Sequence, residues 1–380
     1  MNMKKLFGII VLAMLAVCST ALVSCGDDEE NIAPQEQENN DDNTNNPDDP
    51  KDQDTPAVKD VIVEVDEEGK ANDGHRFTKI DATNFYIDDI KYTASQGNLI
   101  VTGYDQAYFN GEANIITTLK YDGRTMNVTE ISADAFKNCT VLTSIAIPNS
   151  VTKIGYNAFT GCTGLTKAEF ASVESLCKIS FGDYYANPLY YAHHLYINGE
   201  EIKDLVIPNS VTNIGDYAFY GCSSLTSVTI PNSVTTIGYD AFYGCTGLTS
   251  ITIPNSVTNI GDYAFYGCSS LTSVTIPNSV TEIGWRAFSG CSSLTSINIP
   301  NSVTSIGEGV FSGCSGLTDI YCYATTPPST IYYYNYQQYI LNPFDNINIS
   351  SITLHVPAQS VDTYKSTSPW SGFGSIVVIE

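Results

Sequence analysis

The sequence is poor in basic side chains and in histidine. Its 380 residues hold 17 Lys and Arg against 41 Asp and Glu, a net charge of −24, and 4 His. Proteins that bind nucleic acid neutralise phosphates with clustered basic residues, so this balance excludes that class of function. Beyond the first 25 residues the sequence has no apolar run long enough to predict a membrane-spanning helix.

The motifs of catalysis and metal binding are missing too. The sequence contains no GxSxG, HExxH or glycine-rich phosphate loop, and no CxxC. Its one histidine pair is His193-His194, and adjacent residues of a strand point to opposite faces, so these two would not share a metal ion. We therefore expect no metal, no cofactor and no enzymatic activity. The alternative hypothesis is an enzyme that uses residues 165–201.

What the sequence does contain is a repeat, which fills residues 202–314. An apolar residue opens each copy, and the next copy starts 23 residues later. A cysteine closes each copy with the same step. A period in the twenties is typical of a solenoid in which each turn is one supersecondary unit. The opening residues are Ile202, Leu225, Leu248, Leu271, Leu294 and Leu317, and the closing ones are Cys222, Cys245, Cys268, Cys291 and Cys314.

One copy, residues 225–245, indicates how a turn folds. Val228 and Ile230 are two residues apart, which is the spacing of one strand face. Pro231 ends that strand, because proline cannot donate to a strand ladder. The end of the copy has helix-like apolar spacing on a short turn. We expect eight residues to face the core, namely Leu225, Val228, Ile230, Val234, Ile237, Ala241, Phe242 and Cys245.

The pattern LxxVxIPxxVxxIGxxAFxxC resembles the BspA-like leucine-rich repeat, a variant found in bacterial surface proteins. Seven closing units fit it, and the resemblance covers roughly residues 95–380. It implies a repeat solenoid of short parallel β-strands and short helical or 3-10 turns, with a β-rich N-terminal cap and an irregular C-terminal cap. It also implies adhesion, since some members of this family bind extracellular-matrix proteins of a host or other bacteria. The closing units are Ala135 to Cys139, Ala158 to Cys162, the four from Ala218 to Cys291, and Val310 to Cys314.

The N-terminus predicts export and a lipid anchor. Residues 1–24 combine Lys4 and Lys5 with a short apolar stretch, the pattern of a signal peptide. Leu22-Val23-Ser24-Cys25 resembles a lipoprotein cleavage site, so Cys25 is the expected lipidated residue; an ordinary secretory signal is the alternative. Residues 25–56 are acidic and nearly free of apolar side chains, which predicts a disordered tether. Together these features predict a cell-surface lipoprotein on the outer membrane of a Gram-negative bacterium.

The folded part divides into three predicted regions. Residues 57–127 carry short strand patterns without the repeat motif and are the expected N-terminal β cap. The solenoid is expected over 128–317 and the C-terminal cap over 318–380. Within the solenoid, residues 165–201 are 14 residues longer than the period and contain Asn198-Gly199, a hairpin signal. We expect this insertion to form a protruding hairpin.

The repeat places seven cysteines in one register, which predicts free thiols. Equivalent residues of neighbouring turns lie about 4.8 Å apart with parallel Cβ vectors. A disulfide needs its Cβ atoms at about 3.8 Å. We therefore expect these cysteines to be small buried apolar residues.

Two surfaces are candidates for binding. One consists of exposed Thr and Ser rows on the strands, at 226, 227 and 229 and their equivalents one and two turns later. The other is aromatic, and tyrosine and tryptophan are common interface anchors. The expected partner is a host extracellular-matrix or cell-surface protein, or a glycan, bound by a monomer anchored through its lipid. The candidate binding residues are Tyr184, Tyr185, Tyr190, Tyr191 and Tyr196 of the insertion, and Tyr217, Tyr239, Tyr263 and Trp285 of the repeat.

Overall fold

The computed structural model describes residues 60–334 and 337–379, which lie in one compact unit. The predicted signal peptide at 1–24, the lipidation site Cys25 and the tether at 25–56 lie outside the described residues. Among the residues that are described, no helix is both long and apolar enough to cross a membrane.

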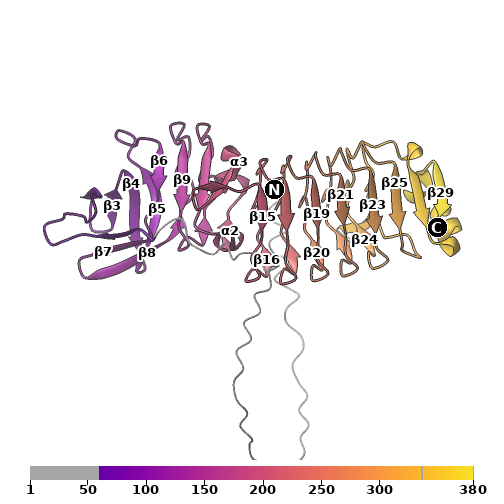
Figure 1. Cartoon of the computed structure of the whole chain (residues 1–380), viewed down its shortest axis with the longest axis horizontal. Helices are drawn as coiled ribbons and strands as arrows, with labels where there is room; N and C mark the ends of the chain where they lie inside the picture. Colours follow the sequence, from indigo (N-terminus) through magenta and orange to yellow (C-terminus); the bar gives the residue numbers. More distant parts are fainter. Residues whose placement is uncertain (1–59, 335–336, 380) are drawn as a thin grey trace, which may run out of the picture. The chain divides into compact units, whose positions relative to one another are not determined.

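The repeat folds as a solenoid whose first strands form one parallel sheet (Figure 1). Equivalent residues pair across it with the 23-residue step, for example Val228 with Ile251 and Ile251 with Val274. The predicted repeat solenoid is thereby confirmed. The strands, in order, are β15 (Asp204–Val206), β17 (Ser227–Thr229), β19 (Ser250–Thr252), β21 (Ser273–Thr275), β23 (Ser296–Ile299), β25 (Asp319–Cys322), β28 (Thr353–Val356) and β29 (Ser375–Val378).

A second, shorter strand follows in each turn, after the Pro-Asn-Ser bend. These two-residue strands form a second parallel sheet, with Ile237 paired to Ile214 and to Ile260. The residues between it and the closing cysteine make the turn that returns the chain to the first sheet. The strands are β16 (Asn213–Ile214), β18 (Thr236–Ile237), β20 (Asn259–Ile260), β22 (Glu282–Ile283) and β24 (Ser305–Ile306).

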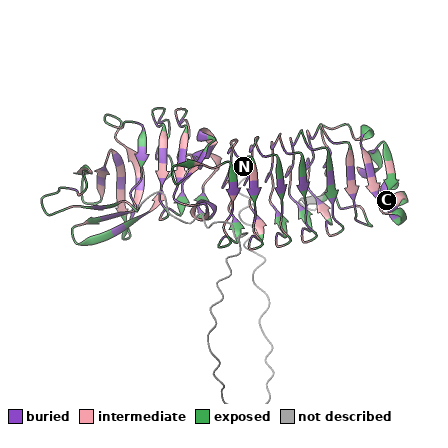
Figure 2. Ribbon diagram, viewed as in Figure 1, coloured by how far each residue is buried: buried purple, intermediate pink, exposed green. Residues whose placement is uncertain are grey.

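The core runs between the strands and these turns, and all eight residues predicted to face it in the copy 225–245 are buried. Buried and exposed residues alternate along the strands (Figure 2). The phenylalanines stack from turn to turn; the rings of Phe242 and Phe265 lie 5.4 Å apart at an angle of 4°. Each stacked ring removes its neighbour's apolar surface from water, which no single turn could do alone.

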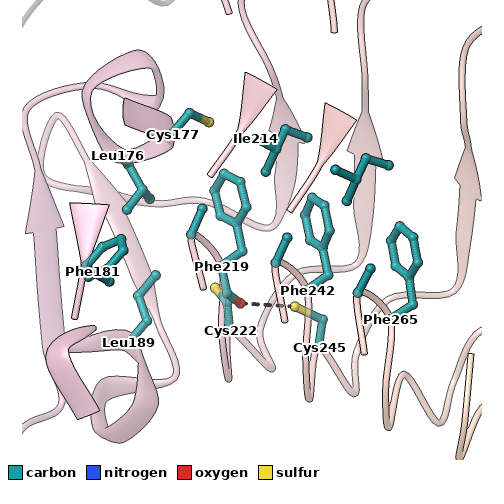
Figure 3. Close-up of a cluster of buried hydrophobic side chains, with 14 of the residues drawn as sticks. Leu176, Cys177, Phe181, Leu189, Ile214, Phe219, Cys222, Phe242, Cys245 and Phe265 are labelled. Atoms are coloured by element: carbon teal, nitrogen blue, oxygen red, sulfur yellow. Dashed lines mark hydrogen bonds between the residues drawn. The ribbon is translucent and has the colours of Figure 1, made fainter. Parts of the chain in front are cut away.

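The closing cysteines line the same core as free thiols. All nine cysteines of the described residues are buried and unpaired, and for the seven in the repeat register this confirms the prediction from their geometry. The Cys245 thiol donates to the carbonyl of Phe219 one turn back, at 3.3 Å (Figure 3), and Cys268 repeats the bond to Phe242. Burial raises the pKa of the Cys222 thiol to about 12, so these groups stay protonated and donate.

The N-terminal region contains the expected β structure, but the repeat ladder begins earlier than Val128. β5 pairs in parallel with β8, and β6 (Glu112–Asn114) pairs in parallel with β9 (Ser144–Ile147). Backbone pairing needs no particular side chain, so a turn forms where the motif is absent. The other pairs of this region, β2 with β3, β3 with β4, β4 with β5 and β7 with β8, are antiparallel, while β1 pairs with β7 in parallel. The strands are β1 (Ile62–Glu64), β2 (Phe77–Lys79), β3 (Asn84–Ile87), β4 (Ile90–Ser95), β5 (Asn98–Tyr104), β7 (Thr118–Tyr121) and β8 (Arg124–Ile131).

Residues 165–201 do not form the protruding hairpin that was predicted. Most of them make a complete solenoid turn, because β11 pairs in parallel with β9 and β12 with β10. Only the pair β13 and β14 around Asn198-Gly199 is a hairpin, and both of these residues have positive φ, as the turn requires. The elements are β10 (Lys153–Ile154), β11 (Lys167–Phe170), α2 (Val173–Lys178), β12 (Ser180–Phe181), η3 (Tyr184–Ala186), α3 (Leu189–Ala192), β13 (Leu195–Ile197) and β14 (Glu200–Glu201).

The first-strand sheet is interrupted at this turn, but the hydrophobic core is continuous across it. β13 pairs with β14, while a different sheet starts at β15. In a regular turn the N–H of Phe219 donates to the carbonyl of Ala241, and the residue after Ala241 is the next stacking phenylalanine. Here the N–H of Phe159 donates to the carbonyl of Tyr185, so Ala186 occupies the position of that phenylalanine. Leu176, Phe181 and Leu189 of this turn lie in the same core cluster as Phe219 (Figure 3).

The C-terminal region closes the core, as expected of a cap. Trp370 is fully buried against Phe344, which continues the phenylalanine stack, and its Nε1–H donates to the carbonyl of Pro328 at 3.3 Å. Besides β28 and β29, the region contains β26 (Ile331–Tyr334), β27 (Gln337–Ile340), η4 (Ile349–Ser351), η5 (Ala358–Ser360), α4 (Val361–Ser366) and η6 (Trp370–Gly372).

Candidate functional site

The turns that face away from the first sheet bring tyrosines together. The N–H of Phe219 donates to the carbonyl of Ala241 and that of Phe242 to Ala264, each at 2.8 Å, so these turns stack in register. Side chains 23 residues apart therefore lie on one another. The rings of Tyr220, Tyr243 and Tyr266 form a column with 4.6 Å between successive centroids.

The tyrosines of the 165–201 turn extend this column. Tyr184 of η3 stacks on Tyr220 at 5.5 Å and 19°, and Tyr190 of α3 lies 5.8 Å from the same ring. Tyr185 and Tyr191 contact Tyr190 in turn, at 5.1 and 4.7 Å. The insertion tyrosines and the aromatic stripe, which the sequence presents as two separate candidates, thus form one surface.

A second row runs beside the column. Tyr239 meets the rings of Tyr217 and Tyr263 edge-on, at 5.5 and 5.8 Å. Tyr217 contacts Tyr220 and Tyr263 contacts Tyr266, which joins the two rows. We call the whole surface the tyrosine array: Tyr184, Tyr185, Tyr190, Tyr191, Tyr217, Tyr220, Tyr239, Tyr243, Tyr263 and Tyr266.

Tyr196 lies outside the tyrosine array, and Trp285 lies beside it. Tyr196 belongs to β13, where the Nζ of Lys167 lies 5.0 Å from the centre of its ring. Trp285 lies one turn beyond Tyr263, whose N–H donates to its carbonyl at 2.7 Å. The insertion therefore contributes four tyrosines to the array and not five.

The array contains backbone strain at two of its tyrosines. The residue before the Ala or Val of each closing unit has positive φ, which Asn, Asp and Gly tolerate and bulky residues rarely adopt. Asn157 and Gly309 suit the position, but Tyr217 and Tyr263 occupy it with φ of 62° and 57°. The stacked turns impose this conformation in every copy, so Tyr217 and Tyr263 adopt it at a cost that the surrounding fold offsets.

Three carboxylates lie among the tyrosines, and the sequence analysis missed them. The signal was present as a swap in residue order, Asp216-Tyr217, Tyr239-Asp240 and Asp262-Tyr263. The swap turns Asp240 inward, to 5% exposure, while Tyr239 is 39% exposed. Burial, together with the charges of Asp216 and Asp262, raises the pKa of Asp240 to about 7, and its Oδ1 has no hydrogen-bond partner.

The predicted Thr and Ser rows lie on the exposed face of the first sheet. Register places Thr229, Thr252 and Thr275 in one row. That row continues through Asn298 and Tyr321 to His355, residues that the sequence analysis did not single out. The rings of Tyr321 and His355 stack at 4.2 Å.

The two histidines of the predicted pair have separate partners. His193 has positive φ at the end of α3, and its Nδ1 lies 3.0 Å from the Gly221 carbonyl oxygen. His194 pairs with Glu201 at 2.7 Å. No group of three or more metal-ligating side chains is present in the part of the chain that the structure describes.

Comparison with known proteins matches the chain to one family. The model of the "BspA type Leucine rich repeat region" matches residues 105–187 and 192–318, in six copies. No curated protein matches the chain.

Solved structures of bacterial leucine-rich repeat proteins are similar to it. A leucine-rich repeat protein from Bacteroides ovatus shares 25% identity, over 78% of this chain and 76% of that one, with a TM-score of 0.49. The leucine-rich repeat protein of T. pallidum shares 27%, over 63% and 91%, with a TM-score of 0.34. A leucine rich cell surface protein from Faecalibacterium prausnitzii shares 20%, over 79% and 96%, with a TM-score of 0.29.

Proposed function

We propose that this chain, which belongs to the BspA type leucine-rich repeat family, is a surface-anchored adhesion protein. The repeat of this family is a non-enzymatic protein-binding fold. In this proposal the tyrosine array binds a protein of a host or neighbouring cell. The observation that carries this proposal is the continuity of the array across the irregular turn and three regular ones. A regular turn offers every partner the same rows, whereas this junction is unique in the described chain.

The physical properties of the array favour a protein partner. Tyrosine supplies a large amphipathic contact area at a low cost in rotamer entropy. Stacking fixes the rings before a partner arrives, which reduces the entropy lost on binding. Most of the rings are half-buried, and the side-chain hydrogen bond with Tyr185, together with burial, raises the pKa of Tyr184 to about 12, so they present neutral hydroxyls.

Charge narrows the kind of partner. Asp183, Asp216 and Asp262 border the array, and the chain carries a net charge of −24. Lys and Arg side chains bind such a surface through carboxylates and through tyrosine faces. The partner in this proposal therefore presents a basic patch, and its association slows as salt is added.

Anchoring completes the proposal. A lipid on Cys25 and the acidic segment 25–56 would hold the folded part away from the outer membrane, on the cell surface. Glycan capture, with the rings stacked on sugars, is the competing function of the same surface.

A binding screen of the full-length protein tests the function. Extracellular-matrix proteins and glycans are arrayed together, and we expect a matrix or cell-surface protein to bind. The variant Tyr184→Ala with Tyr239→Ala should then lose at least tenfold in affinity, about 1.4 kcal/mol. The matched control, Tyr196→Ala, removes a tyrosine outside the array and should bind normally.

A second variant separates binding from stability. Tyr263→Asn replaces a strained residue by one that tolerates positive φ, as Asn157 does in its own turn. We expect weaker binding while the melting temperature stays within a few degrees. Binding that survives both variants would exclude the array, and hydrolysis of an arrayed glycan would point to an enzyme.

A further inference from the structure

Two departures from the repeat meet at one hollow, at the ends of β21, β23 and β25. In the regular turns the row on the exposed face consists of Thr229, Thr252 and Thr275, and the next position is Asn298. Pro277 and Pro300 end their strands, but one period later the residue is Tyr323. The hollow has a volume of about 470 Å³, and its lining residues are Ile276, Asn278, Asn298, Pro300, Asn301 and Tyr323.

We propose that this hollow is a binding site for a neutral carbohydrate, independent of the tyrosine array. Its volume falls within the range of small-molecule sites, about 300–1,000 Å³. The site lies on the strand side of the turns, whereas the array lies on the segments that close them.

The polar groups of the hollow match sugar hydroxyls. Asn278, Asn298 and Asn301 are exposed, and within the described chain none of their side-chain amides has a hydrogen-bond partner. Each amide offers two donor hydrogens and a carbonyl acceptor. A hydroxyl both donates and accepts, so neighbouring hydroxyls on a sugar ring satisfy such amides without any charge.

The aromatic wall matches the apolar C–H face of a sugar ring. Tyr323 is 43% exposed, and its backbone N–H donates to the carbonyl of Ile299 at 2.9 Å, which fixes the start of its side chain. Ile276 and Pro300 are buried and form an apolar floor. A ring with an apolar C–H face fits against a tyrosine and this floor, because that contact removes apolar surface from water.

Charge excludes the other common small ligands. None of the six lining residues carries a charge, so a phosphate or carboxylate would find no cation. The net charge of −24 repels anions further. A cation would find no carboxylate in the lining. What remains is a neutral polyhydroxylated molecule.

The test measures binding of neutral hexose and N-acetylhexosamine oligosaccharides to the full-length protein by calorimetry and ligand-observed NMR. We expect at least one of them to bind. Asn298→Thr restores the residue of the regular turns, and Tyr323→Ala removes the wall but keeps the backbone N–H. Each should weaken binding at least tenfold while the melting temperature is unchanged.

The control is Asn255→Ala, which removes the Asn equivalent to Asn278 from a regular turn outside the hollow. It should bind like the unmodified protein. The proposal is overturned if no neutral oligosaccharide binds, or if both variants of the hollow bind normally. Loss of sugar binding in the Tyr184→Ala, Tyr239→Ala variant instead would move the sugar to the array and overturn it as well.

Discussion

Asp240 shows how much a single residue changes in this repeat. Its equivalents Tyr217 and Tyr263 expose part of their rings, but the carboxylate of Asp240 is buried with one oxygen unpaired. An unpaired buried charge is costly, so the folded protein holds the proton to a higher pH than the unfolded chain does.

The consequence is a stability that depends on pH. The pKa of Asp240 is about 7 in the fold against an ordinary value of 3.8, so the folded state binds an extra proton between these values. Stability therefore falls as pH rises from about 4 to about 7 and stays low above it. Asp240→Asn should raise the free energy of unfolding by about 1–3 kcal/mol at pH 8, and by much less at pH 4.

Denaturant unfolding of the variant and the parent at both pH values measures this. Asp122→Asn is the control, because Asp122 is exposed, has no part in the shift of Asp240, and has a positive φ that Asn also tolerates. An equal gain at pH 4 and pH 8 would show that the charge of Asp240 is not the cause.

At the scale of the element, stacking of turns depends on glycines where backbones touch. A Cβ at Gly261 would lie 2.7 Å from the carbonyl carbon of Gly238 and 2.8 Å from its oxygen. Backbone atoms of a neighbouring turn cannot rotate away as a side chain does. Gly261→Ala should destabilise the fold by about 1–3 kcal/mol.

The melting temperature is the measurement for this variant. Ser250→Ala, on the exposed face of β19, is the control and should leave the melting temperature within about a degree. A Gly261→Ala protein as stable as its parent would mean that neighbouring turns separate more easily than their packing implies.

The cysteine column gives a second test at this scale. Its thiols are buried and donate to carbonyls of the phenylalanine one turn back, so oxidation would break both packing and hydrogen bonds. Thiol titration after denaturation without reductant should find at least seven free thiols. In the native protein the same thiols should react slowly, since burial raises the pKa of Cys162 and Cys222 to about 12. Three or more disulfides would contradict the structure.

At the scale of the whole molecule, the proposed attachment to the cell surface depends on a lipid anchor. The proposed anchor is the lipid on Cys25, which precedes the described residues. Cys25→Ala should move the protein from the membrane fraction to the soluble fraction, because no other anchor is predicted by the sequence. Cell fractionation followed by immunoblotting shows the change. Retention of the variant in membranes would refute lipidation as the anchor.

The sequence by itself determined the solenoid and its core. A fixed step of 23 residues forces equivalent backbone groups to pair, and this sets both the register of the strands and the residues that point inward. Val228, Phe242 and Cys245 could therefore be assigned to the core without coordinates. The hairpin at Asn198-Gly199 was equally local, since the turn depends on those two residues alone.

Only the tertiary structure decided the contacts between residues that are not equivalent in the repeat. The path of residues 165–201 is set by α2 and by pairing with β9 and β10, and only this path brings Tyr184 onto Tyr220. The inward turn of Asp240 and the hollow beside Tyr323 likewise depend on neighbours from other turns. A repeat fixes the spacing of equivalent residues, but contacts between non-equivalent ones depend on packing in three dimensions, which no period encodes.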